Sequence, residues 1–282
     1  MYMKKKISKK KETNTSITKP IIIGTCLCGR NIEKIIIPYY EKKINEFENL
    51  RFEYIRKENN EFTSDTHNKL LIKIKEKYKN KIKGIVIIGS DDIIPDTLLK
   101  FYNDLGNNTF DSKKVYGVDK VYIYDVYLND MYECKTDRYR TGIGRYYPYS
   151  LLRDCDYKLW QAGIMRGLDH SALETCKLYN YKEIINIEDG YVIDCKTDKN
   201  ITPINRIVSP KDKLDSWGEI DHPLLSEVKK YFDTNIKIED GCYYSVMIID
   251  DRLGNVGGII KMEGSTARAL LAKNLIEVIS KI

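Results

Sequence analysis

Two adjacent carboxylates, Asp91 and Asp92, follow a short apolar run in the sequence. That run, residues 85–88, contains only β-branched residues, which is typical of a strand buried on both faces of a parallel sheet. In open α/β sheets, ligands bind just beyond the carboxyl ends of such strands. A carboxylate pair in that place suits a divalent cation and a phosphate group. The local alternative is that the pair caps the helix expected around Pro95.

The segments that must position this pair follow the order β-α-β-α-β within the first 90 residues. The predicted strands are 21–24, 50–55 and 85–88, and the predicted helices begin at Asn31 and Asp65. We expect residues 25–30 to form a loop and Pro38 to end or kink the first helix. This order predicts an α/β fold with a doubly wound sheet of mostly parallel strands flanked by helices.

The rest of the chain is expected to add mixed elements and a C-terminal appendage. A Val/Tyr/Ile-rich stretch, 115–127, predicts one long strand or hairpin arm, and residues 224–232 predict a helix. Residues 241–250 and 256–262 predict a hairpin, and residues 265–281 a final helix. The predicted organisation is a disordered basic tail (1–18), an α/β domain (19–208) and a small α+β appendage (209–282).

Composition and charge narrow the class of protein. The formal net charge of +6 is uneven, because residues 1–19 carry seven lysines against one glutamate. Such a polar arm can bind nucleic acid or an anionic membrane surface, and it lacks the apolar core of a secretory signal. No apolar run approaches the ~20 residues that a membrane span needs. Seven irregularly spaced cysteines favour reduced thiols, so we expect a cytoplasmic protein.

Several motifs, taken in order, resemble family-2-like glycosyltransferases of the GT-A fold. The matching stretches are the loop beneath the nucleotide (22–31), a helix opening (65–68), an acidic DxD-type motif in Ser-Asp-Asp form (87–92), a glycine-spaced stretch (142–145) and a late acidic motif (167–170). The resemblance covers about residues 21–201. It implies a GT-A-like nucleotide-binding sheet.

The resemblance also implies a reaction, in which a sugar moves from a nucleoside-diphosphate sugar to an acceptor hydroxyl with Mn²⁺ or Mg²⁺ as cofactor. It assigns metal binding to Asp92 directly and to Asp91, and it assigns the general base to Asp169. The residues implied to bind the nucleotide sugar are Thr25, Arg30, Asn68, Ser90, Asp91 and Arg145. Gly144 and His170 would lie on the acceptor side.

Alternatives remain open from the sequence. Asp169 could instead cap the helix that begins next to it, and His67 is expected to be exposed. Residues 192–196 have the D-x-K shape of a metal-dependent nuclease strand, but the upstream turn at 189–190 leaves little room for a partner acid. The chain could also be a non-catalytic nucleic-acid-binding protein that uses its basic N-terminal arm. The acceptor could be a glycan, a protein or a hydroxylated nucleic-acid base.

Overall fold

The fold was analysed in a computed structural model. It describes residues 19–79, 81–107, 113–118, 120–126, 129–134, 141–181, 184–197, 207–208, 210–216, 220, 222–235, 243–248, 259–263 and 276–281. The predicted N-terminal tail, 1–18, lies outside the described residues. Within them, the strands form three sheets with helices packed on the first.

The first sheet has the strand order β2-β1-β3-β8-β5-β9. Its strands are β1 (Ile21–Leu27), β2 (Leu50–Arg56), β3 (Gly84–Ile88), β5 (Val115–Gly117), β8 (Arg145–Pro148) and β9 (Ile184–Asn186). The β1/β2, β1/β3 and β5/β9 pairs are parallel, and β8 runs antiparallel to both of its neighbours. The predicted α/β class with a mostly parallel sheet is confirmed.

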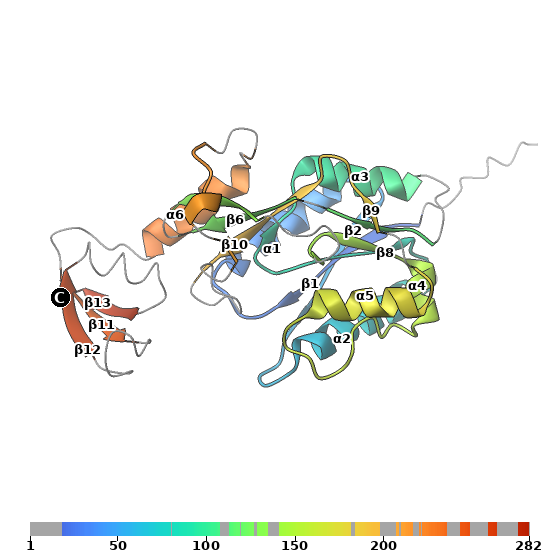
Figure 1. The fold of residues 1–282 in the computed structure, drawn as a ribbon, viewed down its shortest axis with the longest axis horizontal. Coiled ribbons are helices and arrows are strands. Elements are labelled where there is room, and N and C mark those ends of the chain that lie inside the picture. Colours follow the sequence, from blue (N-terminus) through green and yellow to red (C-terminus); the bar gives the residue numbers. More distant parts are fainter. Residues whose placement is uncertain are drawn as a thin grey trace, which may run out of the picture.

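Helices cover both faces of this sheet, which explains its continuous apolar strands. One face carries α1 (Glu33–Lys43) and α3 (Asp96–Asn107), and the other carries α2 (Thr63–Tyr78), α4 (Tyr149–Asp154) and α5 (Leu168–Leu178) (Figure 1). Successive strand residues point to opposite faces. Ile21 and Ile23 therefore pack in the α1/α3 layer, while Ile22 packs against α2. The sequence of a strand that is buried on both sides is therefore continuously apolar and does not alternate with polar residues.

Directly after β3, the chain enters a second sheet. It has the order β4-β10-β6-β7, formed by β4 (Asp92–Ile93), β10 (Tyr191–Lys196), β6 (Lys120–Asp125) and β7 (Asp130–Cys134). Only residues 89–91 separate β3 from β4, so the chain passes from one sheet to the other within a tight turn. That turn places the acidic pair at the junction of the two sheets.

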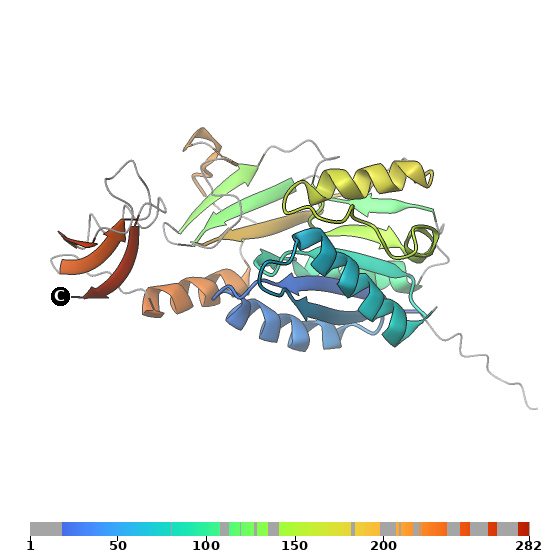
Figure 2. The same cartoon turned by 90° about the horizontal axis from the view of Figure 1, so that it is seen from below.

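The C-terminal part contains α6 (Pro223–Asn235) and a third sheet, which lies apart from the first two in Figure 1 and Figure 2. The helix packs against α1, and its buried side chains join the core beneath the first sheet. The third sheet consists of β11 (Tyr243–Ile248), β12 (Ile259–Glu263) and β13 (Ile276–Lys281), in the order β12-β11-β13. The predicted β11/β12 hairpin is confirmed. The domain division at residue 209 stays a prediction.

Several local predictions are wrong. The strand β1 continues to Leu27, through part of the predicted loop 25–30, because β2 pairs with it along its whole length. Pro38 does not end α1, which continues through it to Lys43, and the exposed position of Pro38 leaves the buried side of the helix intact. The expected final helix is a strand over 276–281, where β-branched residues favour pairing with β11.

The stretch 115–127 is not one strand, because β5 and β6 belong to different sheets. The six cysteines that the structure describes are all free thiols. No helix in the described part of the chain is both long and apolar enough to cross a membrane. A short 3₁₀ turn, Ile44–Glu46, follows α1, and another, Pro210–Asp212, precedes α6.

Candidate active site

Three buried carboxylates, Asp91, Asp92 and Asp194, meet at the junction of the two sheets. Asp91 ends the turn after β3, Asp92 begins β4, and Asp194 comes from β10, which pairs antiparallel with β4 so that Asp92 lies opposite Asp194. The backbone N–H of Cys195 donates a hydrogen bond to the carbonyl of Asp91. One oxygen from each carboxylate lies within 4.8 Å of the others. We refer to these three residues as the acidic cluster.

Two cationic side chains partly compensate the acidic cluster. Arg30 forms an ion pair with Asp91, and Lys196 Nζ lies 2.6 Å from Asp194 Oδ2. Among the described residues, Asp92 has no ion pair and accepts a hydrogen bond from the backbone N–H of Gly89. Burial, together with the charges of Asp194 and Asp91, raises the pKa of Asp92 well above its ordinary value. Burial also raises the pKa of Asp194, although Lys196 opposes it.

The acidic cluster suits a divalent cation. Its three side chains all offer carboxylate oxygens, the ligands that Mg²⁺ and Mn²⁺ prefer. Asp194 Oδ1 is buried and accepts no hydrogen bond from any described residue. A buried acceptor without a hydrogen-bond partner costs free energy, and a bound cation would provide that partner. The cation would also neutralise the negative charge of the acidic cluster that Arg30 and Lys196 do not compensate.

Side chains of α1 hold the turn in place. Glu33 accepts hydrogen bonds from the Ser90 hydroxyl at 2.8 Å and from the backbone N–H groups of Cys28 and Gly29, at 2.6 and 3.1 Å. It therefore joins the loop after β1 to the turn after β3. The Tyr40 hydroxyl donates to the carbonyl of Asp92 at 3.1 Å and accepts the backbone N–H of residue 94 at 2.6 Å. Both contacts fix the position at which β4 starts.

Gly89 gives the two acidic side chains room to turn back over the backbone. A Cβ atom at this position would lie 2.7 Å from Asp92 Oδ2 and 2.8 Å from Asp91 Oδ1, closer than a Cβ atom tolerates. The acidic cluster therefore requires a residue without a side chain at position 89. In the Gly-Ser-Asp-Asp sequence, the glycine provides this space, Ser90 bonds Glu33, and the two aspartates supply the carboxylates.

The acidic cluster and Asp169 line one cavity, with a volume of about 210 Å³. We refer to it as the site cavity. Asp169 lies in the first turn of α5, with its carboxylate against the backbone of Gly142, where a Cβ atom would collide with it. Burial raises the pKa of Asp169, although the backbone of Gly142 and the charge of Arg145 oppose the shift. A carboxylate with a raised pKa in a cavity is a candidate for proton transfer.

His67 and Trp160 form part of the wall of this cavity. The expectation that His67 is exposed is wrong, because the Trp160 ring packs on it with centroids 5.0 Å apart. His67 Nδ1 lies 2.8 Å from the carbonyl of Thr63, which can only accept, so Nδ1 carries the proton. Burial lowers the pKa of His67, so the ring is neutral and its Nε2 is an acceptor.

Other residues expected at the site have different positions. Asn68 does not line the cavity, since its amide bonds the backbone of Trp160 in both directions, at 2.8 and 3.2 Å. Arg145 is fully buried in β8 and donates to the carbonyl of Thr141 at 2.6 Å. These two residues therefore support the walls of the cavity.

Three further positions lie outside the cavity lining. Gly144 donates its N–H to the carbonyl of Ile87 at 2.8 Å, with a φ of +69° that favours glycine. Thr25 is buried in β1, next to Ile88 of β3. His170 is exposed on α5. The cavity thus brings together Arg30, Ser90, Asp91, Asp92 and Asp169 from the expected set.

Arg30 also lines a neighbouring cavity of about 350 Å³, at the carboxyl ends of β1 and β2. Its walls include Tyr54 and Arg56 of β2 and Glu33 of α1. One arginine therefore stands between this cavity and the acidic cluster. Ligands of α/β sheets bind at this edge.

Two residues of the candidate site, Asp194 and Lys196, are absent from the set expected from the sequence. The signal for them is the D-x-K pattern of 192–196, but the upstream turn at 189–190 leaves little room for a partner acid nearby in the sequence. The partner is Asp92, which β4 brings opposite Asp194 from a distant part of the chain.

Comparisons with known proteins give distant matches. No protein-family model matches the chain, and no curated protein matches it. A solved structure of a glycosyltransferase involved in the glycosylation of the major capsid of PBCV-1 matches with a TM-score of 0.38 and 9% identity, over 62% of this chain and 93% of that chain. A putative glucose-1-phosphate thymidylyltransferase from Bacillus anthracis, in complex with a sucrose, matches with a TM-score of 0.35 and 12% identity, over 62% and 89%.

Proposed function

We propose that the protein is a metal-dependent glycosyltransferase that moves a sugar from a nucleoside-diphosphate sugar to an acceptor hydroxyl. The observation that supports this most strongly is that the acidic cluster and Asp169 line the same cavity. Sugar transfer needs cationic stabilisation of a leaving diphosphate and a base for the incoming hydroxyl. The cavity offers a group for each requirement.

Arg30 suits the diphosphate of the donor. It lines both the cavity of the acidic cluster and the cavity beside Tyr54, so a nucleotide in the second cavity would direct its phosphates past the guanidinium. A guanidinium can bond two phosphate oxygens at once. Lys196 adds a second positive charge in the site cavity. We place the nucleoside by Tyr54 and the transferred sugar by the acidic cluster.

Asp92, Asp194 and Asp91 would hold a Mg²⁺ or Mn²⁺ ion. Such an ion neutralises the negative charge that develops on a departing diphosphate. Asp92 is the direct ligand in this proposal, because it is the member of the cluster that no cationic side chain pairs with among the described residues. Glu33 and Tyr40 act as positioning residues, since they hold the turn that carries it.

Asp169 would act as the general base. It accepts the proton of the acceptor hydroxyl while that oxygen bonds to the anomeric carbon of the sugar and the bond to the diphosphate breaks. The raised pKa of Asp169 strengthens it as a base compared with an ordinary carboxylate. His67 presents a second acceptor in the same cavity and is the alternative base.

The test measures cleavage of nucleotide sugars, by acceptor or by water, in wild-type protein and single variants. We expect Asp92→Ala and EDTA each to abolish the reaction, and Asp169→Asn to lower kcat far more than it weakens donor binding. Asp215→Asn is the matched control, because Asp215 is exposed and lines neither this cavity nor the other cavities described here. Full activity of Asp92→Ala, or in EDTA, would show that the acidic cluster has another role.

A second candidate function is metal-dependent hydrolysis of phosphodiesters. The observation that favours it is the position of Asp92 directly opposite Asp194, with Lys196 two residues further along the same face of β10. This supplies the partner acid that a D-x-K nuclease strand requires. Mg²⁺-dependent cleavage of nucleic acid that is lost in Lys196→Ala, without any turnover of nucleotide sugars, would favour this function over sugar transfer.

A further inference from the structure

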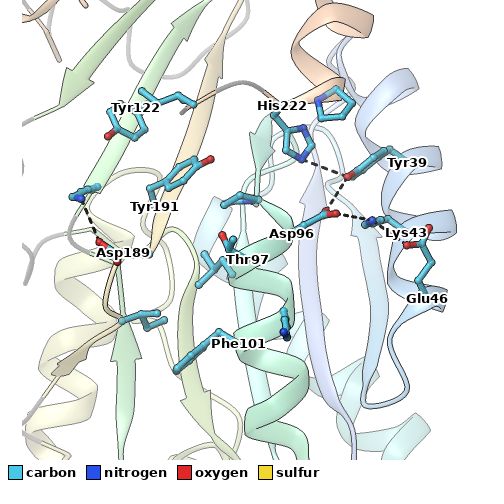
Figure 3. Close-up of a pocket in the computed structure, with 18 of the residues that line it drawn as sticks. Tyr39, Lys43, Glu46, Asp96, Thr97, Phe101, Tyr122, Asp189, Tyr191 and His222 are labelled. Carbon is cyan, nitrogen blue, oxygen red and sulfur yellow. Dashed lines mark hydrogen bonds and ion pairs between the residues drawn. The ribbon is translucent and has the colours of Figure 1, made fainter. Parts of the chain in front are cut away.

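A second and larger cavity lies on the other face of the second sheet. Its volume is about 1070 Å³, and its walls come from α1, α3, the start of α6 and the strands β6 and β10 (Figure 3). None of the residues that line it lines the site cavity. Tyr191 faces this cavity, whereas Asp194, three residues further on β10, faces the site. Odd spacings along a strand place side chains on opposite faces. We refer to this cavity as the α1/α3 groove.

Aromatic rings come from several walls of the α1/α3 groove. Tyr122 and Tyr191 lie on neighbouring strands, with ring centroids 5.4 Å apart, and Phe101 lies on α3 (Figure 3). Tyr39 adds a ring from α1. All four are only partly buried, so each leaves part of its apolar surface open to the groove. Partly exposed rings in a cavity of this size are typical of ligand sites.

The charged residues of the groove favour hydroxyl donors over anions. Six carboxylates and four lysines line it. Lys43 already pairs with Asp96 at 2.7 Å and with Glu46 at 2.9 Å. Asp104 and Glu188 are exposed and have no ion pair among the described residues, so their oxygens can accept hydrogen bonds from a ligand. The excess of negative charge disfavours a polyanion such as nucleic acid.

The wall nearest α6 is ordered by hydrogen bonds. The backbone N–H of Leu224 donates to His222 Nδ1 at 3.2 Å, so the proton of the neutral ring is on Nε2. Nε2 lies 3.4 Å from the Tyr39 hydroxyl, which leaves that hydroxyl free to donate to Asp96 Oδ1 at 3.5 Å. The dashed lines in Figure 3 show this chain of contacts. The groove therefore has a wall that is formed before a ligand binds.

We propose that the α1/α3 groove binds a neutral oligosaccharide. The rings of Tyr122, Tyr191 and Phe101 would stack on the apolar faces of sugar rings, and Asp104 and Glu188 would accept hydrogen bonds from sugar hydroxyls. This goes beyond the proposed function, because the groove would hold a glycan away from the acidic cluster. It does not depend on which reaction the acidic cluster performs.

The test is direct binding of neutral oligosaccharides to the full chain by isothermal titration calorimetry. The probes are hexamers of α-glucan, β-glucan, mannan, xylan and chitin. We expect at least one to bind, and Tyr191→Ala to weaken it about two- to tenfold, as the loss of one aromatic stack implies. Tyr191→Phe should retain binding. Glu188→Gln, an exposed change that leaves folding intact, should also weaken it.

Two control variants separate this groove from other surfaces. Tyr179→Ala removes an exposed ring directly after α5, outside the groove, and should bind the oligosaccharide normally. Asp92→Asn should also bind it normally, because the acidic cluster is not part of the groove.

Three outcomes would overturn the proposal. One is the failure of every hexamer to bind. Another is binding that neither Tyr191→Ala nor Glu188→Gln weakens. The third is binding that Asp92→Asn removes, which would place the glycan at the acidic cluster. Titration of the wild-type protein with Mn²⁺ and nucleoside diphosphates separately reports on the proposed active site, so a failure of one proposal is distinguishable from a failure of the other.

Discussion

The substitution Asp92→Asn should stabilise the metal-free protein while removing its response to metal. The oxygens of the acidic cluster lie within 4.8 Å of one another. At that separation, with an effective dielectric constant of about 20, each pair of like charges costs about 3.5 kcal/mol. Arg30 and Lys196 pair with the other two carboxylates and offset part of this cost. An asparagine has nearly the same shape and removes one charge.

At a pH above the raised pKa of Asp92, where its carboxylate is charged, we expect Asp92→Asn to raise the free energy of unfolding in EDTA by about 1–3 kcal/mol, which is the unbalanced part of this repulsion. In a protein of this size, each kcal/mol shifts Tm by about 2–4 °C. Saturating Mn²⁺ should reverse the order. Wild-type protein at a cation concentration of about 1,000 times Kd gains about 4.1 kcal/mol, whereas the variant gains little.

Thermal unfolding of both proteins, in EDTA and in Mn²⁺, measures this crossover. Asp215→Asn is the control, and should change stability by less than about 0.5 kcal/mol in either condition, as an exposed substitution does. Lower stability of Asp92→Asn in EDTA would refute the electrostatic reasoning. An equal gain from Mn²⁺ in the variant and the wild type would refute the role of Asp92 as a ligand.

Three further changes test other parts of the site. The base role proposed for Asp169 requires its charged form. Because burial raises the pKa of Asp169, kcat should fall as the pH falls through that pKa, which lies above the ~3.9 of a free aspartate. Asp169→Asn should lose this limb of the pH profile and about 10²–10⁴-fold of kcat. Tyr40→Phe should lower the free energy of unfolding by about 1–3 kcal/mol in urea, because the carbonyl of Asp92 and the N–H of Ile94 lose this partner. Gly89→Ala should weaken Mn²⁺ binding in calorimetry, since its Cβ displaces both neighbouring carboxylates; unchanged affinity would show that the turn adapts.

The parts of the fold that the sequence predicted depend on local patterns. The strand before Asp91 is a run of β-branched residues, and the helix over α2 repeats apolar residues at helical spacing. Such periodicity is present within a few turns of chain, whatever the partner. For the same reason, the position of the acidic pair directly after a buried strand is sufficient to predict it as a candidate site.

The parts that were missed depend on contacts between distant segments. Asp194 joins the acidic cluster only because β10 pairs antiparallel with the two residues of β4, and a strand so short has no periodicity to detect. His67 is buried because Trp160, far along the chain, covers it. Asn68 is in the expected helix, but its amide is engaged by the backbone of Trp160. Local patterns contain none of this information.

The most direct test of the central proposal is calorimetric titration of the wild-type protein with UDP, GDP, CDP and ADP, each with Mn²⁺ and with EDTA. The proposal predicts that one of these nucleotides binds in Mn²⁺, that EDTA abolishes this binding and that Asp92→Asn abolishes it too. Binding that is equally strong in EDTA and in Asp92→Asn, or the failure of all four nucleotides to bind in Mn²⁺, would contradict a metal-dependent nucleotide-sugar site at the acidic cluster.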